Sequence, residues 1–133
     1  MAALQQIQLL VNLARIDGAM DEQEKAYIVN IGVANGFPAS SVETLFYASE
    51  EVQLGDALTD QERFNYLFSL IQLMKIDGRL YKNEIRYCAD MAARLGYDKE
   101  VMFELMSKVH GIDMDKGEVD ALRDLTHRYL KGH

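Results

Sequence analysis

The chain carries two twelve-residue stretches of the same design: LARIDGAMDEQE at residues 13–24 and LMKIDGRLYKNE at residues 73–84. In each stretch an apolar segment ends in Ile-Asp-Gly, and a glutamate follows seven residues after the aspartate. Glycine ends a helix readily because it adopts the left-handed conformation without a Cβ clash, and glutamate suits the positive start of the next helix. Each stretch therefore predicts a helix, a tight acidic turn and a second helix.

The similarity between the two stretches extends along the chain at a constant shift of 60 residues. The identical pairs are Leu10/Leu70, Leu13/Leu73, Ile16/Ile76, Asp17/Asp77, Gly18/Gly78, Glu24/Glu84, Tyr27/Tyr87 and Gly36/Gly96. A repeated supersecondary unit usually exists because one copy cannot bury its own apolar face. We expect an internal duplication about a pseudo-twofold axis, with copies at about residues 4–50 and 64–110 and a closing helix at about 116–131.

Helical signals run through the whole sequence, and strand signals do not occur in it. There is one proline, and no segment alternates polar residues with apolar β-branched ones. Start and stop residues predict an all-α single domain over residues 1–133, a bundle of about seven helices. The expected ranges are 3–17, 22–35, 39–50, 60–76, 82–95, 99–110 and 116–131.

Two local patterns refine this prediction. Capping boxes, in which a side-chain oxygen accepts a first-turn N–H and a glutamate three residues on reaches back, are expected at Asp21, Ser40, Thr59 and Asp115. The helices at 3–17 and 60–76 are apolar almost all round, so we expect them to form the central pair of the core.

Composition excludes several classes of protein. A single cysteine, Cys88, rules out a disulfide framework, and its place beside Tyr87 and Met91 predicts a buried, inert thiol. No apolar run is long enough for a membrane span, and the first residues lack the basic region of a secretory signal, so we expect a cytoplasmic protein without membrane insertion. A net charge of −7 disfavours binding to nucleic acid.

The charge is unevenly distributed. Residues 1–60 contain nine acids and two bases, a sum of −7, whereas residues 61–133 contain twelve of each. An acidic surface of this kind suits a basic surface on a partner protein or a cation, and it also serves solubility alone.

Packing does not explain the repeated acids of the two turns. Asp17 and Asp77 follow a helix C-terminus, where the helix dipole disfavours negative charge. One hypothesis is an Asx-turn that organises the backbone, and the other is a bound cation. The candidate metal ligands are Asp17, Asp21, Glu24, Asp77 and Glu84. Because all are oxygen ligands, they favour Ca²⁺, Mg²⁺ or Mn²⁺.

These residues and their spacing resemble the TerB-like tellurite-resistance family over most of residues 4–110. The resemblance implies an all-helical fold with internal duplication, and links the chain to tellurite and other stress and to modules of DnaJ-like membrane co-chaperones. It also implies that Asp17, Glu24, Asp77 and Glu84 are the positions at which a divalent metal binds. Tyr81 replaces the acid found at Asp21, so the second turn matches the family's pattern less well than the first.

Another acidic segment, residues 110–118, matches a calcium loop only in part. Asp113 and Asp115 fit its first and third ligand positions, but Gly117 and Glu118 interrupt the pattern. We expect a connecting loop with Asp115 as the N-cap of the last helix.

Three functional hypotheses follow. The first is a non-enzymatic module whose acidic turns bind a divalent cation or a basic partner protein. The second is a structural or interaction scaffold, either a monomer or a homodimer, without a metal site. The third, a hydrolase with paired carboxylates, lacks an accompanying nucleophile or histidine base. For both interaction hypotheses, the expected exposed apolar residues are Phe46, Tyr47, Phe103 and Met106.

Overall fold

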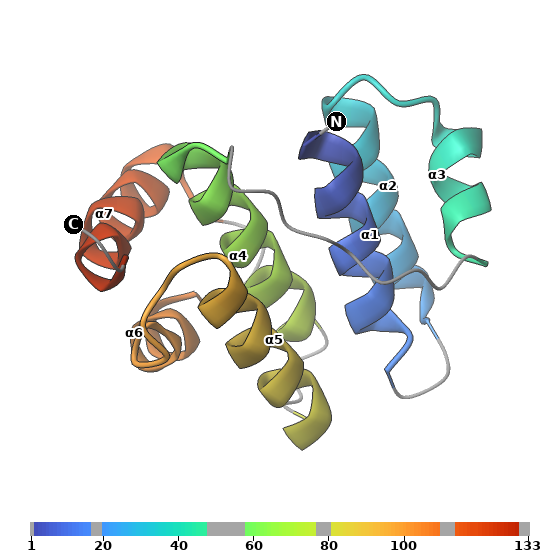
Figure 1. Ribbon diagram of the computed structural model, residues 1–133. Helices are drawn as coiled ribbons and strands as arrows, with labels where there is room; N and C mark the ends of the chain where they lie inside the picture. Colours follow the sequence, from blue (N-terminus) through green and yellow to red (C-terminus); the bar gives the residue numbers. More distant parts are fainter. Residues whose placement is uncertain (1, 17–19, 48–57, 77–80, 110–113, 131–133) are drawn as a thin grey trace.

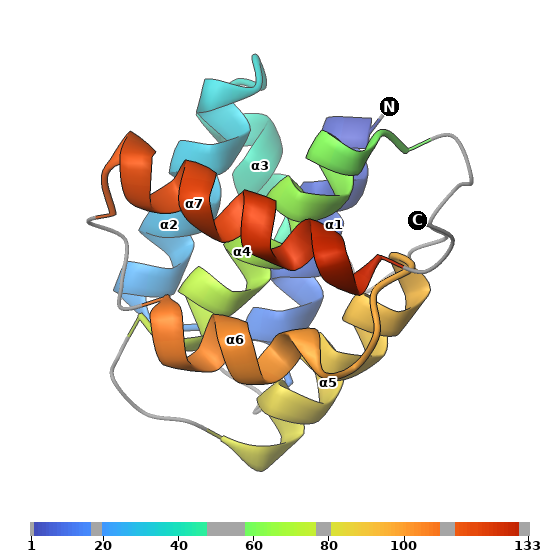
Figure 2. The ribbon, with the colours of Figure 1, turned by 90° about the vertical axis from the view of Figure 1, so that its left-hand side faces the viewer.

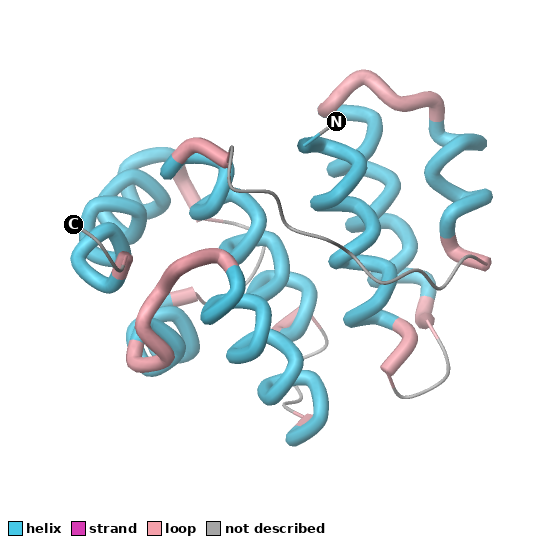
Figure 3. Tube along the Cα trace, in the orientation of Figure 1, coloured by secondary structure: helices cyan, strands magenta, loops and turns pink. Residues whose placement is uncertain are grey.

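The computed structural model describes residues 2–16, 20–47, 58–76, 81–109 and 114–130. These residues form seven α-helices and one short 3-10 helix. Figure 3 shows the helices joined by loops. They are α1 (Ala2–Ala14), α2 (Glu22–Ala34), α3 (Ala39–Leu45), α4 (Asp60–Met74), α5 (Lys82–Arg94), α6 (Val101–Lys108), α7 (Lys116–Thr126) and η1 (His127–Tyr129). The described part contains no strand, only an isolated antiparallel bridge between Tyr97 and Leu130. The predicted all-α class is confirmed.

Helices α1 and α4 form the centre of the molecule, as their apolar surfaces predicted. They pack directly against each other, with α2 beside α1 and α5 beside α4 (Figure 1). Leu10, Leu13, Leu70 and Leu73 are at most 1% exposed. Within the described ranges, no helix has both the length and the hydrophobicity that a membrane span requires.

The remaining helices cover the two ends of this core. Helix α3 packs against α2 and α1 at one end, and α6 and α7 lie at the opposite end (Figure 1). Figure 2 shows α7 lying across α4, with α6 below it, and α7 contacts α6 directly. The α4–α5–α6 group is thus covered by a fourth helix from its own chain.

Three of the four expected capping boxes are present. Asp21, Thr59 and Asp115 each accept the backbone N–H of the third helical residue, whose glutamate in turn accepts the N–H of the cap. The expectation at Ser40 was wrong, because Pro38 is the N-cap of α3 and Ser40 is already helical. Proline has a fixed φ near −65° and lacks an N–H, so it is compatible with a helix start that has no side-chain cap.

The ends of the helices follow glycine signals where these are described. Gly36 and Gly96 have φ values of 93° and 96°, and the residues after them, Phe37 and Tyr97, donate to helix carbonyls five residues back. This is the left-handed C-terminal turn that glycine adopts without strain. The other three predicted stop positions, Gly18, Gly78 and Gly111, lie outside the described residues.

All seven helices end before the predicted residue, and α6 also begins two residues later than expected, at Val101. The largest differences are at α3, which ends at Leu45, and α7, which ends at Thr126 before the 3-10 turn of η1. The chain leaves α7 because Leu130 pairs with Tyr97, which places Leu130 in the core, 6% exposed. This contact between distant segments was not visible in the local sequence.

Helix α2 contains a glycine in its interior for a packing reason. A Cβ at Gly32 would lie 2.4 Å from Cγ2 of Val42 and 3.3 Å from Cδ1 of Ile7. Gly32 therefore allows α1, α2 and α3 to approach one another closely. The residue 60 positions later is Ala92, which is fully buried in α5.

Candidate functional site

The acidic turn ahead of α2 brings two of the predicted ligands together. The Asp21 carboxylate accepts the Glu24 N–H at 2.8 Å, and the Glu24 carboxylate accepts the Asp21 N–H at 3.2 Å. Both carboxylates therefore lie at one helix start, where the positive end of the helix dipole stabilises them. The third expected acid of this turn, Asp17, lies outside the described residues.

The corresponding turn ahead of α5 differs in its cap and in its burial. Tyr81 is the N-cap and makes no side-chain capping hydrogen bond, as the replacement of aspartate predicted. Glu84 occupies the same third helical position as Glu24, but it is only 4% exposed. Its predicted partner Asp77 lies outside the described residues.

The predicted cation site therefore stays a prediction. Within the described ranges, no three His, Cys, Asp or Glu side chains are grouped so that they could hold a metal ion. The first turn contributes Asp21 and Glu24 to such a site and the second contributes Glu84. Hydrogen bonding already accounts for Asp21 and Glu24 as helix caps.

The buried carboxylate of Glu84 lies one helical turn before Cys88. Burial, and to a smaller extent the negative charge of Glu84, raises the pKa of the Cys88 thiol. Because the thiolate is the nucleophilic form, a raised pKa makes this cysteine unreactive. The prediction of a buried, inert thiol is confirmed for its burial.

Two tyrosine–amide hydrogen bonds connect the α1–α3 half with the α4–α6 half, and the sequence analysis missed both. The Tyr27 hydroxyl donates to Oε1 of Gln72 at 2.6 Å, and the Tyr87 hydroxyl is hydrogen-bonded to the Asn12 side chain. Asn12 and Gln72 are 60 positions apart, as are Tyr27 and Tyr87. The signal was present as a polar residue at matching positions of the apolar runs 9–14 and 70–74.

A further polar contact lies between α1 and α4. Gln6 donates from Nε2 to Oγ of Ser69 at 3.2 Å, and the Ser69 hydroxyl donates to the Tyr66 carbonyl at 2.9 Å. All three residues are buried. These bonds satisfy polar groups in the core and fix the register of the central helix pair.

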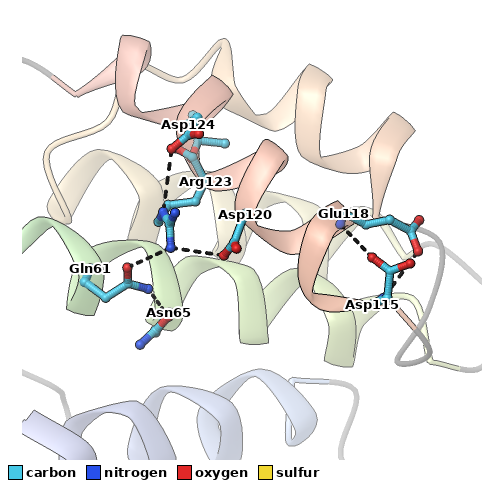
Figure 4. Close-up of polar contacts among 8 residues, drawn as sticks. Gln61, Asn65, Asp115, Glu118, Asp120, Arg123 and Asp124 are labelled. Atoms are coloured by element: carbon cyan, nitrogen blue, oxygen red, sulfur yellow. Dashed lines mark hydrogen bonds and ion pairs between the residues drawn. The ribbon is translucent and has the colours of Figure 1, made fainter.

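The described part of the segment after residue 113 forms the start of α7. Asp115 and Glu118 form a reciprocal capping box, and Arg123 further along α7 contacts Gln61, Asp120 and Asp124 (Figure 4). The predicted role of Asp115 as N-cap is confirmed. Asp113 lies outside the described residues.

The expected apolar surface is partly present. Tyr47 and Phe103 are 87% and 76% exposed, while Met106 is half-buried. The expectation for Phe46 was wrong, because this ring is 7% exposed. Helix α3 ends at Leu45, and the turn that follows directs the Phe46 ring to the core.

A groove of about 720 Å³ lies between α2 and α3. We call it the α2–α3 groove. Its lining residues are Glu22, Lys25, Ala26, Val29, Asn30, Ser40, Glu43, Thr44, Phe46 and Tyr47. A smaller, mostly apolar groove of about 310 Å³ lies beside α7 and is lined by Lys108, Met114, Glu118, Ala121, Leu122 and Leu125.

Comparison with known proteins gave no match: no protein-family model, no curated protein and no solved structure matches this chain. The resemblance to the TerB-like family therefore rests on the chain's own residues.

Proposed function

We propose that this chain is a non-enzymatic helical module that binds a basic surface of a partner protein through its α1–α3 half. The observation that carries the proposal is the concentration of the entire net charge, −7, in residues 1–60. Asp21, Glu22 and Glu43 are exposed on the described surface of this half. Complementary charge accelerates association and selects partners. The same negative charge disfavours nucleic acid as the partner.

The second half makes a different use of its charges. The ion pairs of its described residues join positions close in sequence, such as Lys108 with Glu104 and Arg123 with Asp120. With twelve acids and twelve bases, residues 61–133 generate little net field. The acidic half is therefore the part of the chain suited to steering a basic partner.

We also propose that the chain is a TerB-like module formed by internal duplication. Helices α2 and α5 support this, because their bounds, 22–34 and 82–94, differ by 60 at both ends. The Tyr27–Gln72 and Tyr87–Asn12 bonds are reciprocal under the same shift, which is the pattern that a twofold axis generates. A cytoplasmic location and a link to stress belong to this part of the proposal and rest on the family resemblance alone.

A second candidate function is binding of Ca²⁺, Mg²⁺ or Mn²⁺ at the acidic turns. The convergence of Asp21 and Glu24 on one turn favours it, and the burial of Glu84 at the equivalent helical position supports it. Asp17 and Asp77 would complete the two ligand sets. The alternative is a scaffold, either monomeric or homodimeric, in which these acids only build turns.

The partner proposal is tested with charge reversals in the two halves. A protein captured from cell extract on the immobilised chain is identified, purified and titrated against the wild-type chain. We expect Glu22→Lys/Glu43→Lys to weaken its binding by about tenfold or more, and Asp90→Lys/Asp124→Lys to change it by less than about twofold. Equal effects of the two double variants, or the failure of every captured protein to bind when purified, would refute the proposal.

The metal proposal is tested by thermal unfolding of the metal-stripped chain with and without each cation. A cation at about 100 times its dissociation constant adds about 2.7 kcal/mol. We expect an increase of several degrees in Tm that Asp17→Asn/Asp77→Asn abolishes. If no cation raises Tm, the acids only stabilise the turns and the metal proposal is wrong.

A further inference from the structure

The α2–α3 groove has the geometry of a helix-binding surface. On α2, the wall consists of Glu22, Lys25, Ala26 and Val29, which are spaced i, i+3, i+4 and i+7. On α3 and the turn after it, Ser40, Glu43, Thr44 and Tyr47 have the same spacing. Residues at this spacing form one stripe on a helix, and two such stripes side by side form the groove into which a third helix packs.

The side chains in the groove suit close approach by another helix. Ala26, Ser40 and Thr44 are short and exposed, so a helix can come near the backbone of both walls. Phe46 and the half-buried Val29 supply an apolar floor, and Tyr47 stands at the edge with its ring 87% exposed. Aromatic residues at the edge of an apolar floor are typical of protein interfaces.

The charged residues that line the groove indicate which kind of helix it can bind. Glu22 lies on one wall and Glu43 on the other, and both are exposed. Lys25 is 3.5 Å from Glu22, so its positive charge is partly compensated within the same wall. Residues 1–47, which contain α1–α3, hold five acids and two bases, a sum of −3, so a helix with basic residues on its flanks complements both rims.

Within the part of the chain that the structure describes, only α2, α3 and the turn after α3 line the α2–α3 groove. Helix α6 packs against α5 and α7, whereas the main neighbours of α3 are α2 and α1. A counterpart of α7 sixty residues earlier would be at 56–66, where the chain enters α4 instead. Among the described residues, the α1–α3 half therefore has no counterpart of α7.

We propose that the α2–α3 groove binds one amphipathic helix of the partner protein, with aliphatic side chains at i, i+3 or i+4, and i+7, and with lysine or arginine on both flanks. The aliphatic side chains contact Phe46 and Val29, and the basic side chains face Glu22 and Glu43. This inference rests on the proposed function and names the segment that the acidic half recognises. It is the helix-in-groove mode of peptide recognition.

The test uses the full chain and a pair of synthetic peptides of about 16 residues, roughly four helical turns. One peptide has a leucine stripe flanked by lysines, and the other has glutamates in place of the lysines. Fluorescence anisotropy of labelled peptide reports binding. We expect the lysine peptide to bind at least about tenfold more tightly than the glutamate peptide, and to lose affinity as salt shortens the Debye length from about 10 Å to about 3 Å.

Two matched variants locate the binding site. Ala26→Arg blocks the centre of the α2–α3 groove, and Ala121→Arg makes the same change at an exposed helical position of the groove beside α7. We expect Ala26→Arg to weaken the lysine peptide by about tenfold or more and Ala121→Arg by less than about twofold. If Ala26→Arg unfolds the chain, Thr44→Arg repeats the test from the other wall. Equal effects at positions 26 and 121, or equal binding of the two peptides, overturn the proposal.

The same variants separate this inference from the proposed function. If the purified partner binds wild-type and Ala26→Arg chains equally, the groove is not its site, yet the partner function stands. If neither the lysine peptide nor any purified basic partner binds, both proposals fail. If sedimentation shows a dimer that Ala26→Arg converts to a monomer, the occupant is a second copy of this chain, and the partner-helix proposal is wrong.

Discussion

The α1–α3 and α4–α6 halves of the molecule have the same order of helices, but they differ in what surrounds them. The second half is followed by α7, which packs on α6, and its acidic and basic residues are equal in number. The first half is acidic, begins α2 with a complete capping box, and exposes a groove between α2 and α3. The contrast shows how two similar three-helix units become different when one is covered by its own chain.

The two halves also differ in how they support the core. Gly32 lets α3 approach α2 closely, whereas the matching Ala92 keeps a methyl group between α5 and its neighbours. Tyr27 is buried and bonded to Gln72, whereas Tyr87 is half-buried in its bond to Asn12. Each difference can be tested by a matched substitution in both halves.

The largest expected effect is a loss of stability in alkaline solution. Two of the three groups that cause it, Tyr97 and Cys88, lie in the second half of the chain. Burial raises the pKa values of Tyr27, Tyr97 and Cys88 above those of the unfolded chain. The neutral groups stabilise the fold fully below the unfolded pKa values, about 8.5 for cysteine and 10 for tyrosine, and this contribution is lost as pH rises towards the folded values. Each group then lowers the free energy of unfolding by about 1.4 kcal/mol per pH unit.

Urea unfolding from neutral pH to about pH 11 measures this loss, with phenolate absorbance as the second signal. Tyr97→Phe is the informative variant, because the Tyr97 hydroxyl is buried without a hydrogen-bond partner among the described residues. We expect this variant to be at least as stable as the wild type at neutral pH and to lose less stability at high pH. An unchanged alkaline slope would show that Tyr97 ionises without unfolding the chain.

Substitution of Gly32 tests the closer packing of the first half. Gly32→Ala should lower the free energy of unfolding by about 1–3 kcal/mol, because the new methyl group collides with Val42, and this outweighs the better helix propensity of alanine. Ala92→Gly is the matched change, with an expected loss of about 1 kcal/mol from helix propensity. Denaturant unfolding compares them. An increase in stability with Gly32→Ala would contradict the close approach of α2 and α3.

Removal of the tyrosine hydroxyls tests the contacts between the halves. Tyr27→Phe takes a hydrogen bond from the buried Gln72 oxygen and should destabilise by about 1–3 kcal/mol. Tyr87→Phe should cost less, about 0.5–1 kcal/mol, since water can reach a half-buried amide. Thermal or urea unfolding of both single variants decides the order. A larger loss of stability with Tyr87→Phe than with Tyr27→Phe would contradict this prediction.

The smallest expected effects concern the helix caps. Asp21→Ala removes the side-chain cap of α2 and should destabilise by about 0.5–2 kcal/mol. Tyr81→Asp introduces the missing cap at α5 and should stabilise by a similar or smaller amount, about 0.5 kcal/mol. Unfolding curves of both variants and the wild type show whether each substitution stabilises or destabilises the chain. Destabilisation by Tyr81→Asp would mean that the half-exposed Tyr81 ring contributes packing that exceeds the benefit of a cap.

The positions of the helices were predictable because their signals are local. The Asp21, Thr59 and Asp115 capping boxes involve residues three apart, and the Gly36 and Gly96 turns involve the five preceding residues. Ser40 failed as a cap although it fits the pattern, since Pro38 begins α3 two residues earlier. The pattern in the sequence identified a helix start but not which of the adjacent residues would supply it.

The candidate site was less predictable than the fold. Sequence placed Asp21 and Glu24 at one turn correctly, but the burial of Glu84 and of Phe46 depends on what packs over them. The α2–α3 groove is lined by residues between 22 and 30 on α2 and by residues between 40 and 47 on α3 and the turn after it. Neither stretch has a pattern that predicts the groove by itself.

By itself, the sequence determined that this chain is helical, where most of its helices begin and end, and that its first half is acidic. These properties follow from hydrogen bonds and apolar periodicity within a few residues, and from charges that can be counted. Tertiary structure alone decided the Tyr27–Gln72 and Tyr87–Asn12 bonds, the burial of Phe46 and Glu84, and the open groove between α2 and α3. Those features require segments far apart in the chain to meet, and the angle at which packed helices meet is set by the side chains of both partners.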